Sequence, residues 1–227
     1  MGMFEELASD VIACRACPRL VSWREEVAIT KRAAFQDWTY WGRPVPGFGD
    51  PRARIVVVGL APAAHGANRT GRIFTGDRSG DFLFASLHRM GLANQPTATA
   101  VNDGLKLQNT YVTTAVRCAP PQNQPTSAER DACRLFLTRE MELLAKARVF
   151  VALGAFGYGA IARELGIKPR PKFAHGLEVT AVQRCTVLCS YHVSQQNTFT
   201  GRLTAEMLDA VFARALEIAS RDVPRKR

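Results

Sequence analysis

The stretch from Arg54 to Gly66 reads RIVVVGLAPAAHG and decides the fold class of this chain. It begins with a continuous run of branched apolar residues, which is typical of a strand buried on both faces of a parallel sheet. It continues into small residues that let backbone amides approach a ligand closely. A buried strand that leads into such a loop is the unit from which α/β sheets and their binding sites are built.

Further apolar runs repeat this pattern along the chain. Strands are predicted at Arg54–Gly59, Thr110–Val116, Val149–Leu153 and Thr186–Tyr191, with a further one at Leu177–Val182. Helices are predicted at Phe4–Ile12, Gly80–Met90, Ser127–Ala147, Ala155–Leu165 and Thr204–Ala219. This alternation predicts a three-layer α/β/α sandwich around a mostly parallel sheet of about four strands.

The length of 227 residues, with no repeat and no long linker, predicts a single domain over residues 1–227. We expect an N-terminal segment, residues 1–35, to be tied to this domain and a basic tail, residues 221–227, to follow it. Hydrophobic residues make up 47% of the chain and charged residues 22%, which excludes a disordered or collagenous protein. No apolar run reaches the length of a membrane span, and the N-terminus lacks the pattern of a signal peptide. We therefore expect a cytoplasmic protein that does not bind membranes. We also expect it to be a monomer.

The charge of the chain points to a class of partner. Thirty basic residues against twenty acidic ones give a formal net charge of +10, and most of the basic residues are Arg. The planar guanidinium of Arg holds phosphate oxygens in pairs and stacks on bases. This balance favours a nucleic acid or another polyanion as partner, with a merely solvated basic surface as the alternative.

Four of the six cysteines have a spacing that suggests a metal centre. Cys14 and Cys17 form a C-x-x-C pair directly after the first predicted helix, and Cys118 and Cys133 follow about a hundred residues later. A redox pair of the thioredoxin type is disfavoured because it would lie between a strand and a helix. One close pair with two distant cysteines is compatible with a cubane iron–sulfur cluster, a structural zinc site or four unrelated thiols. The spacing alone leaves these three open.

Chemistry in an open α/β sheet belongs to the loops at the carboxyl ends of the strands. Four such loops are predicted here, and they cover residues 59–77, 118–123, 154–157 and 192–201. The first of them contains neither G-x-x-x-x-G-K-[ST] nor G-x-G-x-x-G, which disfavours nucleoside triphosphate and dinucleotide binding.

At these loops the chain resembles the uracil-DNA glycosylase superfamily, most closely its family 5, the iron–sulfur type. The motifs that carry the resemblance are the four cysteines in order, Gly59-Leu-Ala-Pro-Ala-Ala, Thr75-Gly-Asp77, Cys118-Ala-Pro-Pro and His192-Val-Ser. The resemblance covers nearly the whole chain. It implies a monofunctional glycosylase of base excision repair that flips a deaminated base out of DNA, hydrolyses its glycosidic bond and leaves an abasic site. We expect such a protein to be associated with the nucleoid when it is bound to DNA. It also implies a structural [4Fe-4S] cluster held by Cys14, Cys17, Cys118 and Cys133.

The resemblance also implies the catalytic residues. The related family 4 has a carboxylate directly after the first motif glycine, where this chain has Leu60, so the acid's role passes to Asp77. His192 is implied as the hydrogen-bond donor to the base, and Asn123 as the side chain that orients base or water. On the sequence alone, Asp77 could equally be a helix N-cap, His192 a structural histidine and Asn123 a turn residue.

Two further groups of residues are implied to contact the substrate. Base-binding positions are Ala61, Ala63, His65, Gly66, Phe74 and Thr114. DNA-binding positions are Asn68, Arg72, Ser194, Gln195, Gln196, Asn197 and Arg202. Thr114 occupies the place of a uracil-reading Asn in family 4, and losing that amide predicts tolerance of hypoxanthine and xanthine beside uracil. The alternatives are a core role for Phe74 and turn roles for His65 and Asn68.

Two other functions compete with the glycosylase. One is a non-catalytic DNA-binding protein with a structural iron–sulfur or zinc site, which the missing acid at Leu60 favours. The other is a nucleotide-processing α/β hydrolase that uses the first loop as a phosphate cradle.

Overall fold

The computed structural model describes residues 2–181 and 185–221, and its centre is a six-stranded sheet in the order β1-β3-β2-β4-β6-β5. The strands are β1 (Phe48–Gly49), β2 (Ile55–Gly59), β3 (Thr110–Thr114), β4 (Val149–Leu153), β5 (Glu178–Thr180) and β6 (Thr186–Ser190). The central four, β3, β2, β4 and β6, are parallel, whereas β1 and β5 pair antiparallel at the two edges.

The prediction of a three-layer α/β/α sandwich with a mostly parallel sheet is confirmed, but the sheet has two strands more than the four that form its parallel centre. Every residue of those four strands is buried, including the threonines of β3, which reads TYVTT, and the Thr and Ser of β6, which reads TVLCS. The extra strand β1 is only two residues long and contains no apolar run. The predicted strand at Leu177–Val182 is shorter in the structure, and Val182 lies outside the described residues.

Eight helices and two 3₁₀ turns surround the sheet within the described part of the chain. The helices are α1 (Met3–Ala13), α2 (Pro18–Thr30), α3 (Ala67–Thr70), α4 (Arg78–Arg89), α5 (Ser127–Leu143), α6 (Gly154–Glu164), α7 (Gln195–Phe199) and α8 (Ala205–Ser220). The 3₁₀ turns are η1 (Ala33–Phe35) and η2 (Pro121–Asn123). The capping box at the start of α5 is present, because Thr126 accepts from the Glu129 amide and Glu129 accepts from the Thr126 amide.

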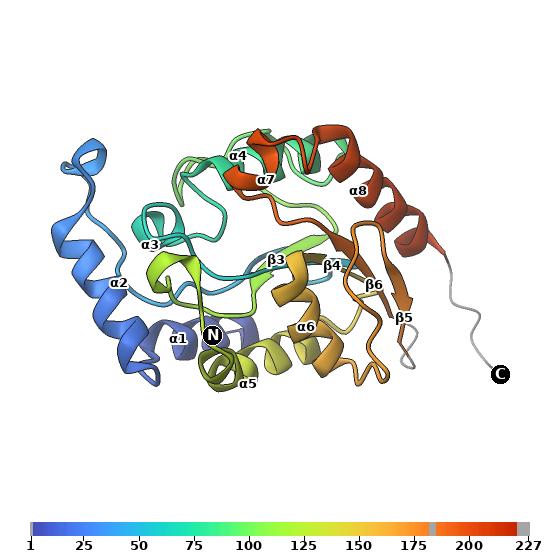
Figure 1. The fold of residues 1–227 in the computed structure, drawn as a ribbon, viewed down its shortest axis with the longest axis horizontal. Coiled ribbons are helices and arrows are strands. Elements are labelled where there is room, and N and C mark those ends of the chain that lie inside the picture. The colour runs from blue at the N-terminus through green and yellow to red at the C-terminus, as the bar shows by residue number, and fades with distance from the viewer. Residues whose placement is uncertain (1, 182–184, 222–227) are drawn as a thin grey trace.

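Helices cover both faces of the sheet (Figure 1). One hydrophobic cluster lies between the sheet and α4 and α8, and it includes Val57, Phe84 and Phe212. The other lies between the sheet and α5 and α6, and it includes Val56 and Ile161. These two clusters bury the two apolar faces of the sheet.

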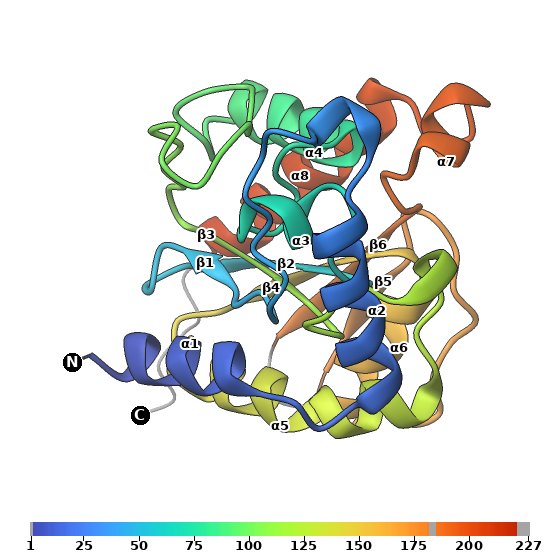
Figure 2. The ribbon, with the colours of Figure 1, turned by 90° about the vertical axis from the view of Figure 1, so that its left-hand side faces the viewer.

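The N-terminal helices pack along one side of the sandwich. Leu7 and Val11 of α1 are buried against Phe136 of α5. From there α2 runs up the side of the molecule to the level of α3 (Figure 2), with which it is in contact. The described residues contain no helix long and apolar enough to cross a membrane. The single-domain prediction stays a prediction, and the tail beyond Arg221 lies outside the described residues.

Candidate active site

A cavity of about 630 Å³ opens at the carboxyl edge of the sheet. Nine of the predicted site residues line it: Ala61, Ala63, Phe74, Asp77, Asn123, His192, Ser194, Gln195 and Gln196. Leu60, Ile73, Ser79, Gln122 and Gln124 complete the lining. These residues come from the loops after β2, β3 and β6, which the parallel strand order brings to one edge. Four of the five additional residues are direct neighbours of predicted ones in sequence, and Ser79 lies two residues after Asp77. This proximity is the signal that could have found them.

Asp77 is both the N-cap of α4 and a wall of the cavity. Its Oδ1 accepts a hydrogen bond from the Gly80 amide at 2.9 Å, which is why α4 begins at Arg78 and not at Gly80. Its Oδ2 lies so close to Gly66 that a Cβ at position 66 would overlap it. Burial raises the pKa of Asp77, while the amides of Gly80 and Ser79 and the charge of Arg69 act to lower it. The cap therefore uses one carboxylate oxygen, and only a glycine fits beside the other.

His192 faces the cavity from the loop that follows β6. Burial lowers the pKa of His192 to about 4, so the imidazole is neutral at physiological pH. Its backbone carbonyl accepts from the Asn197 side-chain amide at 2.8 Å, which ties the loop to α7. The ring lies 6.4 Å from that of Phe74, centroid to centroid. A neutral imidazole here can donate or accept a hydrogen bond but brings no charge.

Phe74 adopts a backbone conformation that is rare for a side chain of its size. Its φ is +53°, in the left-handed region. This turn places the ring across the end of β2, where a Cβ at Gly59 would lie 2.7 Å from the ring's Cζ atom. Phe74 is thus packed against the core and also lines the cavity. Asn123, in η2, has φ +57°, so it too combines a turn conformation with a place in the lining.

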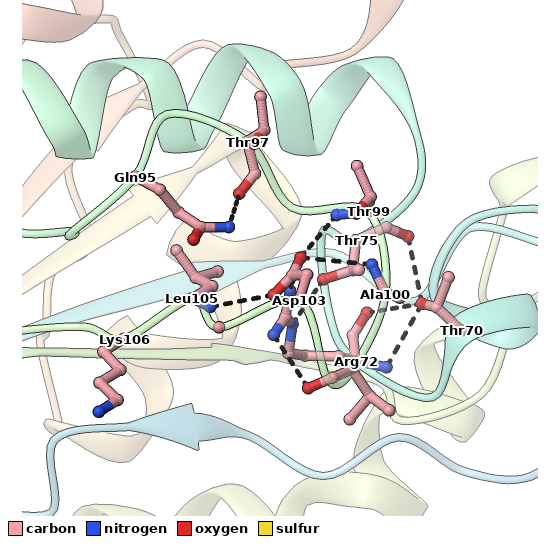
Figure 3. Close-up of polar contacts among 12 residues, drawn as sticks. Thr70, Arg72, Thr75, Gln95, Thr97, Thr99, Ala100, Asp103, Leu105 and Lys106 are labelled. Carbon is pink, nitrogen blue, oxygen red and sulfur yellow. Dashed lines mark hydrogen bonds and ion pairs between the residues drawn. The ribbon is translucent and has the colours of Figure 1, made fainter.

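A buried polar network fixes the segment that carries Phe74 and Asp77 (Figure 3). Arg72 donates from Nε to the Thr75 hydroxyl at 2.9 Å and forms an ion pair with Asp103 at 2.7 Å. Burial opposes ionisation of Asp103, but Arg72 and the amides of three nearby residues lower its pKa to about 2. The Gly76 amide donates to the Ala98 carbonyl at 2.7 Å. The loop over residues 97–105 therefore stabilises the segment that contains Asp77 through these hydrogen bonds and this ion pair.

Several predicted residues lie elsewhere. Arg72 and Asn68 are 6% and 0% exposed, and the Asn68 amide donates to the Arg24 carbonyl at 3.1 Å. His65 faces Tyr40, whose hydroxyl lies 3.1 Å from the His65 Nδ1 atom. Thr114 is buried and donates its hydroxyl to the Val116 carbonyl at 2.8 Å. These side chains support the site from within the protein and are not part of the cavity lining.

The remaining predicted positions lie beside the cavity. Gly66 is in contact with the Asp77 carboxylate, as described above. Asn197 belongs to α7, and the guanidinium of Arg202 lies 4.6 Å from the centre of the Tyr191 ring. Arg202 is exposed and is available to a ligand outside the cavity.

The four cysteines of the predicted cluster gather between α2, α5 and the loop after β3. Cys118 and Cys133 share a buried cluster with Leu20, against which Cys17 packs. Burial raises the pKa of Cys118 to about 12, and the nearby thiols of Cys133 and Cys14 add to this rise while Arg24 opposes it. Within residues 2–181 and 185–221, however, no three or more His, Cys, Asp or Glu side chains are arranged closely enough to hold a metal ion.

An arginine is buried among these cysteines. Arg24 is 2% exposed, and its Nη1 atom donates to the Cys118 sulfur at 2.9 Å. Its Nε atom has no hydrogen-bond partner among the described residues. A buried cation with an unused donor beside four thiols fits an anionic thiolate centre in its chemistry, although the present sulfur spacing does not form one.

Comparison with known proteins places this site in a family. A family model described as the uracil DNA glycosylase superfamily matches residues 46–216. The chain is 53% identical over 221 residues to a type-5 uracil-DNA glycosylase of Mycobacterium bovis, covering 96% of this chain and 82% of that protein. It is 50% identical over 216 residues to a type-5 uracil-DNA glycosylase of Thermus thermophilus, covering 95% and 98%. A type-4 uracil-DNA glycosylase of Archaeoglobus fulgidus is 33% identical over 157 residues, or 69% of this chain and 62% of that protein. The chain therefore belongs to the uracil DNA glycosylase superfamily, in its type-5 branch.

Proposed function

We propose that this chain is a monofunctional DNA glycosylase that flips uracil out of DNA, hydrolyses its N-glycosidic bond and leaves an abasic site. Membership of the type-5 branch supports this reaction. The observation that carries the proposal is a cavity in which one carboxylate, Asp77, lies with a neutral imidazole, His192, and an aromatic ring, Phe74. We place its action in the cytoplasm, in base excision repair of the chromosome.

The reaction needs two kinds of group, and the cavity has both. Breaking an N-glycosidic bond builds positive charge on the deoxyribose and negative charge on the departing base. In our proposal Asp77 stabilises the sugar cation and orients water. His192 donates to the base oxygen where charge develops, helped by the backbone amides of the loop over residues 61–65. Phe74 stacks on the flipped base, and Asn123 orients base or water.

The rim of the cavity suits a DNA strand. Ser194, Gln195 and Gln196 line its edge at the start of α7. Phe199, at the end of α7, is 68% exposed, and an apolar side chain there suits the gap that a flipped base leaves in the stack. Arg202 follows in the same segment and would hold the backbone, so affinity should fall steeply with salt.

The lining argues against a nucleotide-processing hydrolase. Among the described residues that line the cavity there is no Lys or Arg, so the phosphates of a free nucleotide would meet no cation inside. A base can enter such a cavity while its phosphates stay at the basic surface outside.

We propose a base range that extends beyond uracil to hypoxanthine and xanthine. The Thr114 hydroxyl donates to the Val116 carbonyl and is not directed to the cavity. Threonine also has no side-chain amide, so this position provides no group that would select uracil. Base release from duplexes with one uracil, one hypoxanthine or one xanthine measures the range, with free deoxyuridine monophosphate as the control substrate. We expect release from all three duplexes and none from the nucleotide. Release of uracil alone would overturn the broad range, and no release by a folded protein would favour a DNA-binding protein.

We further propose that Cys14, Cys17, Cys118 and Cys133 hold a [4Fe-4S] cluster with a structural role, which ties α1 and α2 to β3 and α5. The cluster would supply cross-linking of these segments and no chemistry on DNA. Protein purified without oxygen should carry iron and acid-labile sulfide and absorb broadly in the visible range. Cys14→Ser should lose that absorption and much of its solubility, whereas Cys185→Ser should keep both. Zinc in place of iron, or a folded and active Cys14→Ser protein without iron, would contradict the assignment.

A further inference from the structure

A buried arginine lies directly behind the loop that carries Asp77. Arg69, in α3, is 4% exposed. Its Nε atom donates to the His65 carbonyl at 2.8 Å, and its Nη2 atom donates to the Gly76 carbonyl at 2.7 Å. His65 precedes Gly66, which touches the Asp77 carboxylate, and Gly76 precedes Asp77 itself. One guanidinium therefore joins the two backbone segments that border this carboxylate.

Two aromatic rings from another part of the chain hold the guanidinium in place. The Arg69 Cζ atom lies 3.9 Å from the ring centre of Phe35, at the end of η1, and 4.1 Å from that of Trp38. Stacking of this kind orients a planar cation and shields it from water. The two groups that accept hydrogen bonds from Arg69 are neutral backbone carbonyls. These hydrogen bonds therefore do not neutralise the positive charge of the guanidinium.

We propose that Arg69 is a positioning residue for the Asp77 carboxylate. Arg69 fixes the two backbone segments that border this carboxylate, and its guanidinium places a permanent positive charge near the carboxylate. The inference rests on the assignment of Asp77 as the carboxylate of the reaction. Nothing in the sequence motifs singles out Arg69, since its role depends on rings that lie more than thirty residues away in the chain.

The groups around Asp77 show how the positive charge of Arg69 affects the pKa of Asp77. Burial raises the pKa of Asp77, and Asp81 of α4 adds to the rise. The opposing groups are the amides of Gly80 and Ser79 and the cation of Arg69. His192, across the cavity, has its pKa lowered to about 4 and adds no charge near neutral pH. Removing Arg69 must therefore raise the pKa of Asp77 and keep the carboxyl protonated to higher pH.

The test compares Arg69→Gln and Arg69→Lys with the wild type in two measurements. Carbon-13 NMR of the carboxyl follows the titration of Asp77 directly, and single-turnover uracil release from a duplex is recorded against pH. In Arg69→Gln we expect the Asp77 midpoint and the acidic limb of the rate to move together to higher pH. The plateau rate should fall about 10- to 100-fold, since the loops are no longer locked. Arg69→Lys keeps the charge but loses the fork and the stacking, so its midpoint stays near wild type while its plateau falls.

A matched control and the contrary outcomes complete the experiment. Arg78→Gln removes an exposed positive charge next to Asp77 in sequence and should leave the Asp77 midpoint unchanged. A wild-type midpoint in folded Arg69→Gln would overturn the proposal, and so would a wild-type plateau in Arg69→Lys if the Gln variant does not fold. If the midpoint moves but Asp77→Asn still releases uracil at the wild-type rate, Arg69 does position Asp77 and the catalytic role of Asp77 is what fails.

Discussion

We expect Asp77→Asn to fold like the wild type and to release uracil from duplex DNA about 10²- to 10⁴-fold more slowly. The fold survives because Asn caps a helix as well as Asp does, so the hydrogen bond from the Gly80 amide is kept. The rate falls because an amide neither stabilises a sugar cation nor takes a proton from water. Single-turnover base release, with circular dichroism to check the fold, measures both parts of this expectation.

The control for this prediction is Asp81→Asn, which alters a carboxylate of the same helix that does not line the cavity. Its rate should stay within about threefold of wild type, as expected for a group with no contact to the reacting atoms. Retention of full activity by Asp77→Asn would assign the chemistry to His192 and the loop amides alone.

Glu140→Ala should destabilise the protein by about 3–5 kcal/mol, which lowers the melting temperature by on the order of 10 °C. Glu140 and Arg117 form an ion pair in which both side chains are almost fully buried between β3 and α5. The carboxylate also accepts from the hydroxyls of Thr113 at 2.7 Å and Tyr111 at 3.2 Å. Truncation leaves the Arg117 cation, 1% exposed, without its counter-charge.

Chemical and thermal unfolding of three proteins test this expectation. Glu178→Ala, which breaks an exposed pair with Arg214, should cost no more than about 1 kcal/mol. The double variant Arg117→Met with Glu140→Leu should recover most of the loss, because it removes both charges from the core. A loss below about 1 kcal/mol in Glu140→Ala would mean that the Arg117 cation is solvated in some other way.

The central strands are predictable because each lies in a segment rich in branched and apolar residues that needs cover on both faces, although β3 and β6 also contain Thr or Ser. The helix α2 is not predicted, since charged residues interrupt its apolar positions and one of them, Arg24, is itself buried. The strand β1 is missed for a different reason: it has only two residues, which are too few to show the alternating hydrophobic pattern of a strand. Its pairing with β3 depends on contacts that only the folded chain makes.

The candidate site, like the fold, has features that the sequence predicts and features that it does not. The loops that contain Asp77, Asn123 and His192 are predicted from the sequence because they follow strands, and parallel strands bring such loops together. The three residues themselves are implied by the family resemblance. The sequence does not reveal whether a polar loop residue points outward or inward. Asn68 and Arg72 resemble DNA contacts in sequence, but the structure directs both into hydrogen bonds within the protein.

The charge of the cavity also has a consequence for the order in which products leave. The described lining residues include one carboxylate and no Lys or Arg. In the proposed reaction, a released base that has taken up negative charge would be repelled by Asp77 and would meet no cation in the described lining that could retain it. In the proposed complex, exposed cations outside the cavity such as Arg202 would hold the phosphates of the abasic strand. If the proposed reaction takes place here, we expect the free base to depart first and the protein to stay on the abasic site until the slower release of DNA.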